Sequence, residues 1–431
     1  MRRGKKGTHM RRLVAAVGVT ALAVGIVGCS TEGSAQGSSA EGSLTILWDT
    51  GSKNGLEAVI EAFEEEHEGV DVEVEYLDSA TLNSQIPTRL AAGTGPDIFR
   101  GDGGRATPKA VLALADRELL APLKSAWVAE LPETVSQPLE SDGEIYGFPI
   151  ALAGTGAVYN DQLMEEHGLT APRTWDEVLQ FCRDARAAGT VAYNIGAATP
   201  YEGRATLEAF AYETVYADTP KFDEEITDGS LTWPESGWGD AIDRQGEMVD
   251  AGCYSDGFAG VDFQTAFGDF FAGKTLGWIG VSSYLQSNTS DYTFSFQPIP
   301  TSNDPDASGM SIFPFGTIGQ NAEAKNAALA TEFIDFMARP EINELYVSNL
   351  SSTPGMIPVF YDQENPPSDQ VSAKILEYLD NGKNYTLANL LYPGPEVTAA
   401  MESNMQVYLT DNATKDQVLQ AIQDAYMQLV D

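Results

Sequence analysis

Two hydrophobic periodicities alternate along residues 43–101, and no other feature of the sequence restricts the fold as strongly. Residues 43–48 (SLTILW) are an apolar run typical of a buried strand, and residues 70–76 (VDVEVEY) alternate between apolar and acidic side chains. Between these strands, apolar residues recur on one helical face: Leu56, Val59, Ile60 and Phe63. A second helical stretch leads into a third strand in PDIFRGD. Strand–helix–strand units cross over right-handed and parallel, so we expect a doubly wound α/β lobe.

A second α/β series begins after Pro149. Helical patterns follow, and two capping boxes, Thr174 to Glu177 and Thr414 to Gln417, predict helix starts. From residue 292 (YTFSFQPIP) the chain is expected to return toward the first lobe. Because one core rarely serves about 400 residues, we predict two lobes. Their boundaries are 43–149 with 296–345 for the N-terminal lobe, and 150–295 with 346–431 for the C-terminal lobe.

The chain opens with MRRGKKGTHMRR, which holds six basic residues and no acid, followed by an apolar run that ends at Cys29. This order is typical of a signal peptide, here 1–28, and the run is too short to span a membrane comfortably. The ending resembles the bacterial lipobox, in which the cysteine is lipidated. An ordinary secretory signal that ends by chance in cysteine is the alternative. Residues 29–42, rich in serine and glycine, predict a flexible linker.

Charge and composition exclude several classes of partner and site. The chain carries a net charge of −38, and loss of six basic residues with the signal peptide leaves −44. Such a surface repels phosphates, which argues against nucleic acid and anionic membranes as partners. His67 and His167 are the only histidines after residue 28, which argues against a Ser–His–Asp or zinc site. The GDGGR segment lacks the phosphate-loop frame, which argues against a nucleotide site. We expect no cofactor, no metal and a monomer.

Two cysteines, Cys182 and Cys253, remain after Cys29. Both follow helical patterns, and outside the cytoplasm they could form a disulfide. Their spacing leaves a bridge and two buried thiols equally open.

Six phrases in order resemble the extracellular solute-binding proteins of ATP-binding-cassette importers, in the group that includes maltose- and oligosaccharide-binding proteins. The phrases span residues 46–76, 89–102, 145–160, 174–189, 270–280 and 326–349. The resemblance implies a periplasmic-binding-protein-like fold, in which two α/β lobes joined by hinge strands close on a ligand. It further implies a carbohydrate receptor, not an enzyme, that docks onto a membrane permease. A lipid on Cys29 would hold it at the extracytoplasmic face of the cell membrane, near that permease.

Ligands of open parallel sheets bind beyond the carboxyl ends of the strands. The loop after the first strand supplies Trp48, Asp49, Ser52 and Lys53, and the loop after the third supplies Asp102 and Arg105. Carboxylate and guanidinium groups suit vicinal hydroxyls through charge-assisted hydrogen bonds. Each of these residues could instead be a loop cap or a surface ion pair.

The second lobe offers aromatic side chains that could cover the apolar face of a sugar ring. Tyr201 resembles a sugar-stacking position of maltose-binding relatives, and Tyr392 lies near where they carry a stacking tryptophan. The other candidates of this region are Glu202, Trp233, Trp278, Ser282, Tyr284 and Phe315. Strand aromatics such as Trp278 could equally be core. Leu152 and Ser282 depart from the maltose-binding pattern, so maltose itself is not implied.

Two other functions compete with a carbohydrate receptor. The same fold could hold a polyamine, through carboxylates and cation–π contacts in a cleft without Arg or Lys. A secreted glycosidase would need two carboxylates about 5–10 Å apart across a glycosidic bond. Lys53 and Arg105 argue against the first, and the sequence contains no phrase that resembles a glycosidase motif.

Overall fold

The computed structural model describes residues 42–350, 355–410 and 412–430. The predicted signal peptide, most of the predicted linker and Cys29 lie outside these residues. Within them, no helix is both long and apolar enough to cross a membrane.

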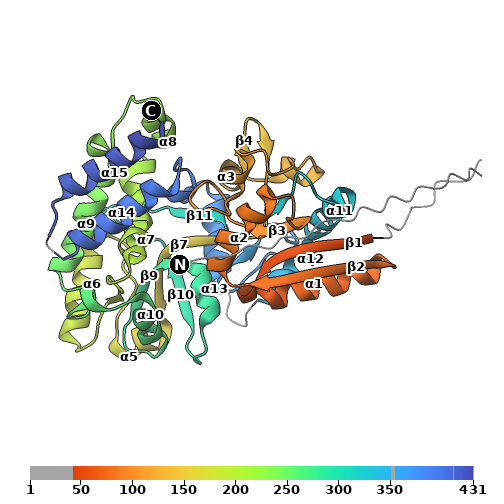
Figure 1. Ribbon diagram of the computed structural model, residues 1–431. Coiled ribbons are helices and arrows are strands. Elements are labelled where there is room, and N and C mark those ends of the chain that lie inside the picture. Colours follow the sequence, from red (N-terminus) through yellow and green to blue (C-terminus); the bar gives the residue numbers. More distant parts are fainter. Residues whose placement is uncertain (1–41, 351–354, 411, 431) are drawn as a thin grey trace, which may run out of the picture. The chain divides into compact units, whose positions relative to one another are not determined.

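The first sheet has the strand order β2-β1-β3-β12-β6. Its predicted strands are confirmed as β1 (Gly42–Asp49), β2 (Val70–Leu77) and β3 (Ile98–Gly101), which run parallel. Figure 1 shows β1 and β2 side by side in red. The sheet is completed by β12 (Thr317–Gln320) and β6 (Phe148–Pro149), and β12 runs antiparallel to both of its neighbours.

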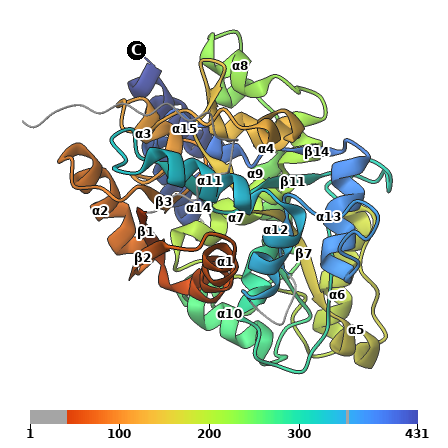
Figure 2. The same cartoon turned by 90° about the vertical axis from the view of Figure 1, so that its right-hand side faces the viewer.

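Helices pack on this sheet through apolar faces that the sequence predicts. Leu56, Val59 and Phe63 of α1 (Lys53–Glu66) are fully buried. The Phe63 ring meets Phe333 of α11 (Ala327–Met337) edge to face, at 5.0 Å between centroids. Further helices of this lobe are α2 (Ser79–Ala91), α3 (Val111–Ala115) and α12 (Pro340–Ser348), and a short hairpin joins β4 (Glu140–Ser141) to β5 (Glu144–Ile145). The short helix α4 (Glu133–Ser136) packs instead on the second lobe, where its Val135 is buried. Figure 2 shows α12 beside α1.

The second sheet is organised around β7 (Ala151–Asn160), whose ten residues are all buried. Its order is β14-β11-β7-β9-β8, and β10 and β13 also pair with β7. The lobe is α/β as expected, but its sheet is mixed rather than parallel, because every partner of β7 runs antiparallel to it. The other strands are β8 (Tyr193–Asn194), β9 (Gly277–Val281), β10 (Phe294–Gln297), β11 (Met310–Pro314), β13 (Ile357–Pro358) and β14 (Asn384–Tyr385).

The second lobe holds nine α-helices in the described part of the chain. They are α5 (Asp161–His167), α6 (Trp175–Ala187), α7 (Pro200–Ala211), α8 (Phe222–Thr227), α9 (Trp238–Asp250), α10 (Phe263–Phe271), α13 (Gln370–Asp380), α14 (Pro395–Tyr408) and α15 (Lys415–Val430). Both predicted helix starts are capped: Thr174 Oγ1 accepts from the Glu177 amide at 3.3 Å, and Thr414 Oγ1 accepts from the Gln417 amide at 3.4 Å. The reciprocal bond forms at Thr414, whose amide donates to Gln417 Oε1, whereas Glu177 accepts from the Arg173 amide.

Two adjacent strand-to-strand crossings join the sheets and form the hinge, and the chain enters the second sheet once more at β13, after α12. The first runs from Pro149 to Ala151 and the second from Pro314 to Thr317. They are hydrogen-bonded to each other, with the Ile150 amide donating to the Gly316 carbonyl at 3.1 Å and the Phe315 amide to the Ala151 carbonyl at 2.8 Å. The return to the first sheet thus follows β11, later than the predicted boundary at residue 296, because β10 and β11 both pair with β7.

Cys182 of α6 and Cys253, which follows α9, form a disulfide between two fully buried sulfur positions. This observation selects the bridge from the two alternatives that the sequence left open.

Candidate binding site

A cavity of about 350 Å³ opens between the two lobes at the hinge. The first lobe contributes Asn83 of α2 and the end of β3, and the second lobe contributes the start of α7 and the segments near residues 284 and 389. Phe315 of the hinge also lines it. The cavity lies beyond the carboxyl end of β3, where the sequence predicted a ligand site.

The wall of the cavity in the first lobe carries two opposite-charge pairs. Arg100 Nε lies 2.8 Å from Asp49 Oδ2, as an ion pair without the alignment of a hydrogen bond. Asp102 accepts from the buried Lys109 ammonium and, at 2.8 Å, from Thr107 Oγ1. Two cations therefore balance two carboxylates, and this wall is electrically neutral overall.

The environment of Asp102 keeps its carboxylate ionised. Burial acts to raise the pKa of Asp102, but the charges of Lys109 and Arg100 outweigh it and hold the pKa below its usual range. Burial lowers the pKa of Lys109, and Asp102 opposes that shift. Their ion pair holds both groups as fixed hydrogen-bonding partners.

The wall in the second lobe is aromatic. Tyr201, in the first turn of α7, and Tyr284, in the 3₁₀ turn Ser282–Ser287, both line the cavity. Their ring centroids lie 6.2 Å apart at 71°, and Phe263 meets Tyr201 edge to face at 5.8 Å. Burial raises the pKa of Tyr201 well above its ordinary value, so the phenol stays neutral. Such rings can cover the apolar C–H face of a polyol.

Two amide oxygens at the cavity have no hydrogen-bond partner among the described residues. Asn83 Oδ1 belongs to the first lobe and Asn389 Oδ1 to the second, and both atoms are buried. A buried acceptor without a donor costs about 1–3 kcal/mol. A ligand that donates hydrogen bonds to both oxygens would remove this cost and link the two lobes.

Four aromatic residues that the sequence proposed as ligand contacts lie in the cores and do not line the cavity. Their exposed fractions are 0% or 1%: Trp48, Trp233, Trp278 and Tyr392. Trp48 packs edge to face on Tyr346, and Trp233 packs on Tyr392. Packing between distant segments buries these rings, so we remove the four from the proposed site.

Two serines among the candidates are also buried and hydrogen-bonded within the protein. Ser52 Oγ accepts from the Trp48 indole at 3.0 Å and donates to the Asp49 carboxylate. Ser282 Oγ donates to the Gly355 carbonyl at 2.7 Å and accepts from the Gly154 amide at 3.1 Å. Their hydroxyls hold loops behind the site, and we remove both from the proposed contacts.

Two predicted basic residues point elsewhere. Arg105 makes a two-pronged ion pair with Asp116, at 2.7 and 2.9 Å, and does not line the cavity. Lys53 lies 3.2 Å from Glu57 on the exposed face of α1. The cations that do line the cavity are Arg100 and Lys109, neither of which was predicted from the sequence. The two-residue period of a strand places Arg100 on the same face as Asp102. This alternation could have identified Arg100 from the sequence.

Glu202 lies behind the aromatic wall and is 1% exposed. Its Oε2 accepts from the Gly196 amide at 3.2 Å. Burial raises the pKa of Glu202 to about 7, and the Gly196 amide and the Trp278 indole act against the rise. The indole acts as a nearby dipole, since neither Trp278 Nε1 nor Glu202 Oε1 has a partner of hydrogen-bond geometry in the described ranges. Glu202 does not line the cavity, so we remove it from the proposed contacts.

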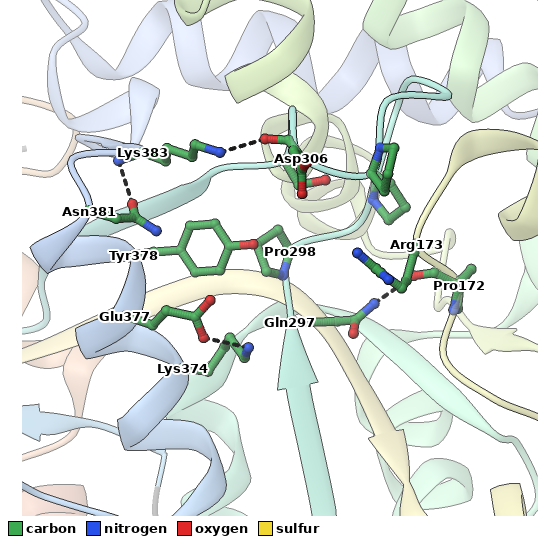
Figure 3. Close-up of a pocket in the computed structure, with 13 residues that line it drawn as sticks. Pro172, Arg173, Gln297, Pro298, Asp306, Lys374, Glu377, Tyr378, Asn381 and Lys383 are labelled. Atoms are coloured by element: carbon green, nitrogen blue, oxygen red, sulfur yellow. Dashed lines mark hydrogen bonds and ion pairs between the residues drawn. The ribbon is translucent and has the colours of Figure 1, made fainter.

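A second cavity, of about 280 Å³, lies within the second lobe (Figure 3). Both of its lysines already have partners, as Lys374 meets Glu377 at 2.6 Å and the Lys383 ammonium donates to the Asp306 carbonyl at 2.5 Å. The Gln297 amide likewise donates to the Pro172 carbonyl. It does not join the two lobes, and we assign the ligand site to the cavity at the hinge. Across the described ranges, no cluster of His, Cys, Asp and Glu is suited to hold a metal ion.

Residues 49–344 match the family model of the bacterial extracellular solute-binding proteins. The chain belongs to this family. It is therefore a receptor for a solute rather than an enzyme, as the sequence predicted, and the family is extracellular.

Named relatives agree with this membership. The solute-binding protein is 24% identical to a binding protein of Brucella abortus (strain 2308), over 84% of this chain and 87% of that protein. It is 31% identical to the galactooligosaccharide-binding protein of Bacillus subtilis (strain 168), over 36% of each chain. RafE of Streptococcus pneumoniae, solved in its apo form, has a TM-score of 0.74 and 18% identity, with coverage of 92% of this chain and 100% of that one. RafE has also been solved in complex with raffinose, with a TM-score of 0.70, 18% identity and coverage of 90% and 100%. These likenesses confirm the two-lobe fold.

Proposed function

We propose that this solute-binding protein captures a neutral carbohydrate between its lobes and delivers it to the permease of an ATP-binding-cassette importer. One observation carries the proposal: Asn83 and Asn389 line one cavity from opposite lobes, and each carries a buried amide oxygen without a hydrogen-bond partner among the described residues. Sugar hydroxyls are donors that can satisfy both oxygens, and the Tyr201 and Tyr284 rings suit the apolar face of the same sugar.

Charge balance in the cavity favours a neutral ligand over a polyamine. A cationic ligand needs unpaired carboxylates, whereas Asp49 and Asp102 are already matched by Arg100 and Lys109. A desolvated ammonium would meet two cations in the same wall. The named relatives that bind a galactooligosaccharide and raffinose support a sugar with galactosyl units as the first ligand to test.

Delivery to a permease and anchoring through a lipid at Cys29 belong to the same proposal. The lipobox-like ending of the signal peptide and the serine- and glycine-rich segment after it support them. Globomycin treatment, which blocks lipoprotein maturation, would then accumulate the unprocessed chain in the membrane fraction. Release of the mature chain into the medium in untreated cells would contradict the anchor.

The binding test uses the mature chain with Cys29→Ser and isothermal titration calorimetry. The panel holds raffinose, stachyose, melibiose, a galactooligosaccharide mixture and spermidine. We expect at least one sugar to bind and spermidine not to bind. Asn83→Ala and Asn389→Ala should each weaken that sugar roughly tenfold.

The matched control is Asn381→Ala, which removes an amide from the rim of the second cavity. It should leave the affinity unchanged. Binding of spermidine alone, or an equal loss in all three variants, would contradict the proposed site.

A further inference from the structure

Arg204 is a buried cation behind the aromatic wall of the cavity. It lies one turn after Tyr201 on α7, and its side chain is 8% exposed. The guanidinium carbon lies 5.2 Å from the centroid of the Tyr201 ring, within the range of a cation–π contact. Arg204 itself does not line the cavity, so it can affect a ligand only through a neighbour.

Two carboxylates fix the Arg204 guanidinium in place. Glu208, one turn further along α7 and 1% exposed, accepts from Arg204 Nη1. Glu402 of α14 accepts from Arg204 Nε at 2.9 Å. A buried ion pair of this kind adds little net stability over apolar packing, so its presence calls for another explanation. The planar guanidinium is suited to grip two carboxylates and to stack on an aromatic ring at the same time.

The Tyr201 ring is held by contacts on several sides. Phe263 and Tyr284 meet it edge to face, at 5.8 and 6.2 Å between centroids, and Arg204 lies over the ring. These contacts fix the orientation of a ring that lines the cavity. A pre-oriented ring loses little freedom when a ligand packs on it, which strengthens binding.

We propose that Arg204 is a positioning residue, held by Glu208 and Glu402, that fixes the Tyr201 ring for contact with the ligand. This inference rests on the proposed function, because it assumes that the cavity binds the sugar. It adds a coupling between α14 and the cavity, since the carboxylate of Glu402 is one of the two groups that hold the guanidinium.

The first experiment measures the environment of the Tyr201 ring in the absence of any ligand. The chain is labelled with 3-fluorotyrosine, and the ¹⁹F resonance of residue 201 is assigned by its loss in Tyr201→Phe. In Arg204→Met we expect that resonance to shift and broaden. Because loss of the cation leaves Glu208 buried and unpaired, Arg204→Met with Glu208→Gln is measured as well. An unchanged resonance in a folded double variant would overturn the inference, whether or not any sugar binds.

The second experiment is a double-mutant cycle with raffinose as the probe. Arg204→Met with Glu208→Gln should weaken raffinose binding roughly tenfold in the Tyr201 background and leave it unchanged in the Tyr201→Leu background. Arg204→Lys, which keeps a cation over the ring, should recover part of the loss. Equal losses in both backgrounds would show that Arg204 acts by another route and would overturn the inference.

The matched control is Arg244→Met. Arg244 also lies over an aromatic ring, 5.0 Å from the centroid of Trp175, and pairs with Glu247 at 3.1 Å. Neither Arg244 nor Trp175 lines the cavity, so this variant should keep full raffinose affinity. If raffinose and the rest of the sugar panel fail to bind the unsubstituted chain, the proposed function fails, and the ¹⁹F result decides the role of Arg204 independently.

Discussion

Gly104 of the first lobe touches the backbone of Leu390 in the second lobe so closely that a Cβ on Gly104 would lie 2.0 Å from the Leu390 carbonyl oxygen. Leu390 also lines the cavity, so this contact lies where the lobes meet around the ligand. Gly104 also has a φ of +68°, which favours glycine on its own account.

Gly104→Ala should therefore hold the lobes apart. We expect a roughly tenfold or larger loss of raffinose affinity, because the methyl group cannot be accommodated against a backbone carbonyl. Small-angle scattering in the presence of raffinose should show a more open molecule than the unsubstituted chain.

Gly143→Ala is the matched control for backbone strain. Gly143 also has a positive φ, +78°, but no atom lies within 4 Å of its added Cβ. Both variants should lose about 1 kcal/mol of stability, and only Gly104→Ala should lose affinity. Equal affinities in the two variants would show that the contact does not limit closure.

The disulfide should stabilise the second lobe without affecting the ligand. Cys182 and Cys253 are 71 residues apart, so loop closure predicts a loss of about 4 kcal/mol in Cys182→Ala with Cys253→Ala. Calorimetry should show a lower midpoint of thermal unfolding for this double variant than for the unsubstituted chain. Its raffinose affinity at 20 °C should be retained. A midpoint within a degree of the unsubstituted chain would contradict a stabilising role.

Glu202 should make stability fall as pH rises. Its folded-state pKa of about 7 exceeds its unfolded value, so the folded chain binds more protons between those two values. The contribution of Glu202 to the free energy of unfolding should therefore decline by up to about 3 kcal/mol between about pH 4.5 and pH 7, and should level off above pH 7. Glu202→Gln should be stabilised relative to the unsubstituted chain most at pH 8 and least at pH 4.

Urea unfolding at several pH values measures this difference. Burial also raises the pKa of Asp223 to about 7, so Asp223→Asn should show a similar trend and serves as a positive reference. Glu165→Gln, at an exposed position of α5, is the negative control. A pH-independent difference between Glu202→Gln and the unsubstituted chain would show that Glu202 titrates normally.

Trp278 should report ligand binding by fluorescence, although it does not line the cavity. Its ring lies 5.7 Å from that of Tyr284, which does line it. Trp278→Phe should therefore abolish most of the change in tryptophan emission on addition of raffinose. Trp233 is equally buried but packs on Trp238 and Tyr392, so Trp233→Phe should preserve that change. The opposite pattern would place the ligand against a different wall.

Local patterns predicted the first lobe well. The alternation of β2 and the apolar face of α1 are each contained within a short segment, and the parallel pairing of β1 with β2 follows from the helix between them. The mixed second sheet was harder to predict. Its central strand β7 pairs with strands more than 100 residues later, and the sequence does not encode the direction of such distant pairs locally.

The aromatic residues illustrate the same limit within the site. Tyr201 and Tyr392 each follow or precede a proline in a loop-like segment, and the sequence treats them alike. The structure places Tyr201 at the cavity and buries Tyr392 against Trp233, because the packing of α14 and α15 covers one and not the other.

The sequence by itself determined the family, the α/β lobes and the position of Asp102 beyond a strand end, because these depend on local periodicity and on an ordered set of motifs. Only the tertiary structure decided which polar groups are left without partners, with Asn83 and Asn389 at one cavity, and which rings reach it. Hydrogen-bond satisfaction and burial are properties of contacts between segments far apart in the chain, and such contacts exist only after the chain has folded.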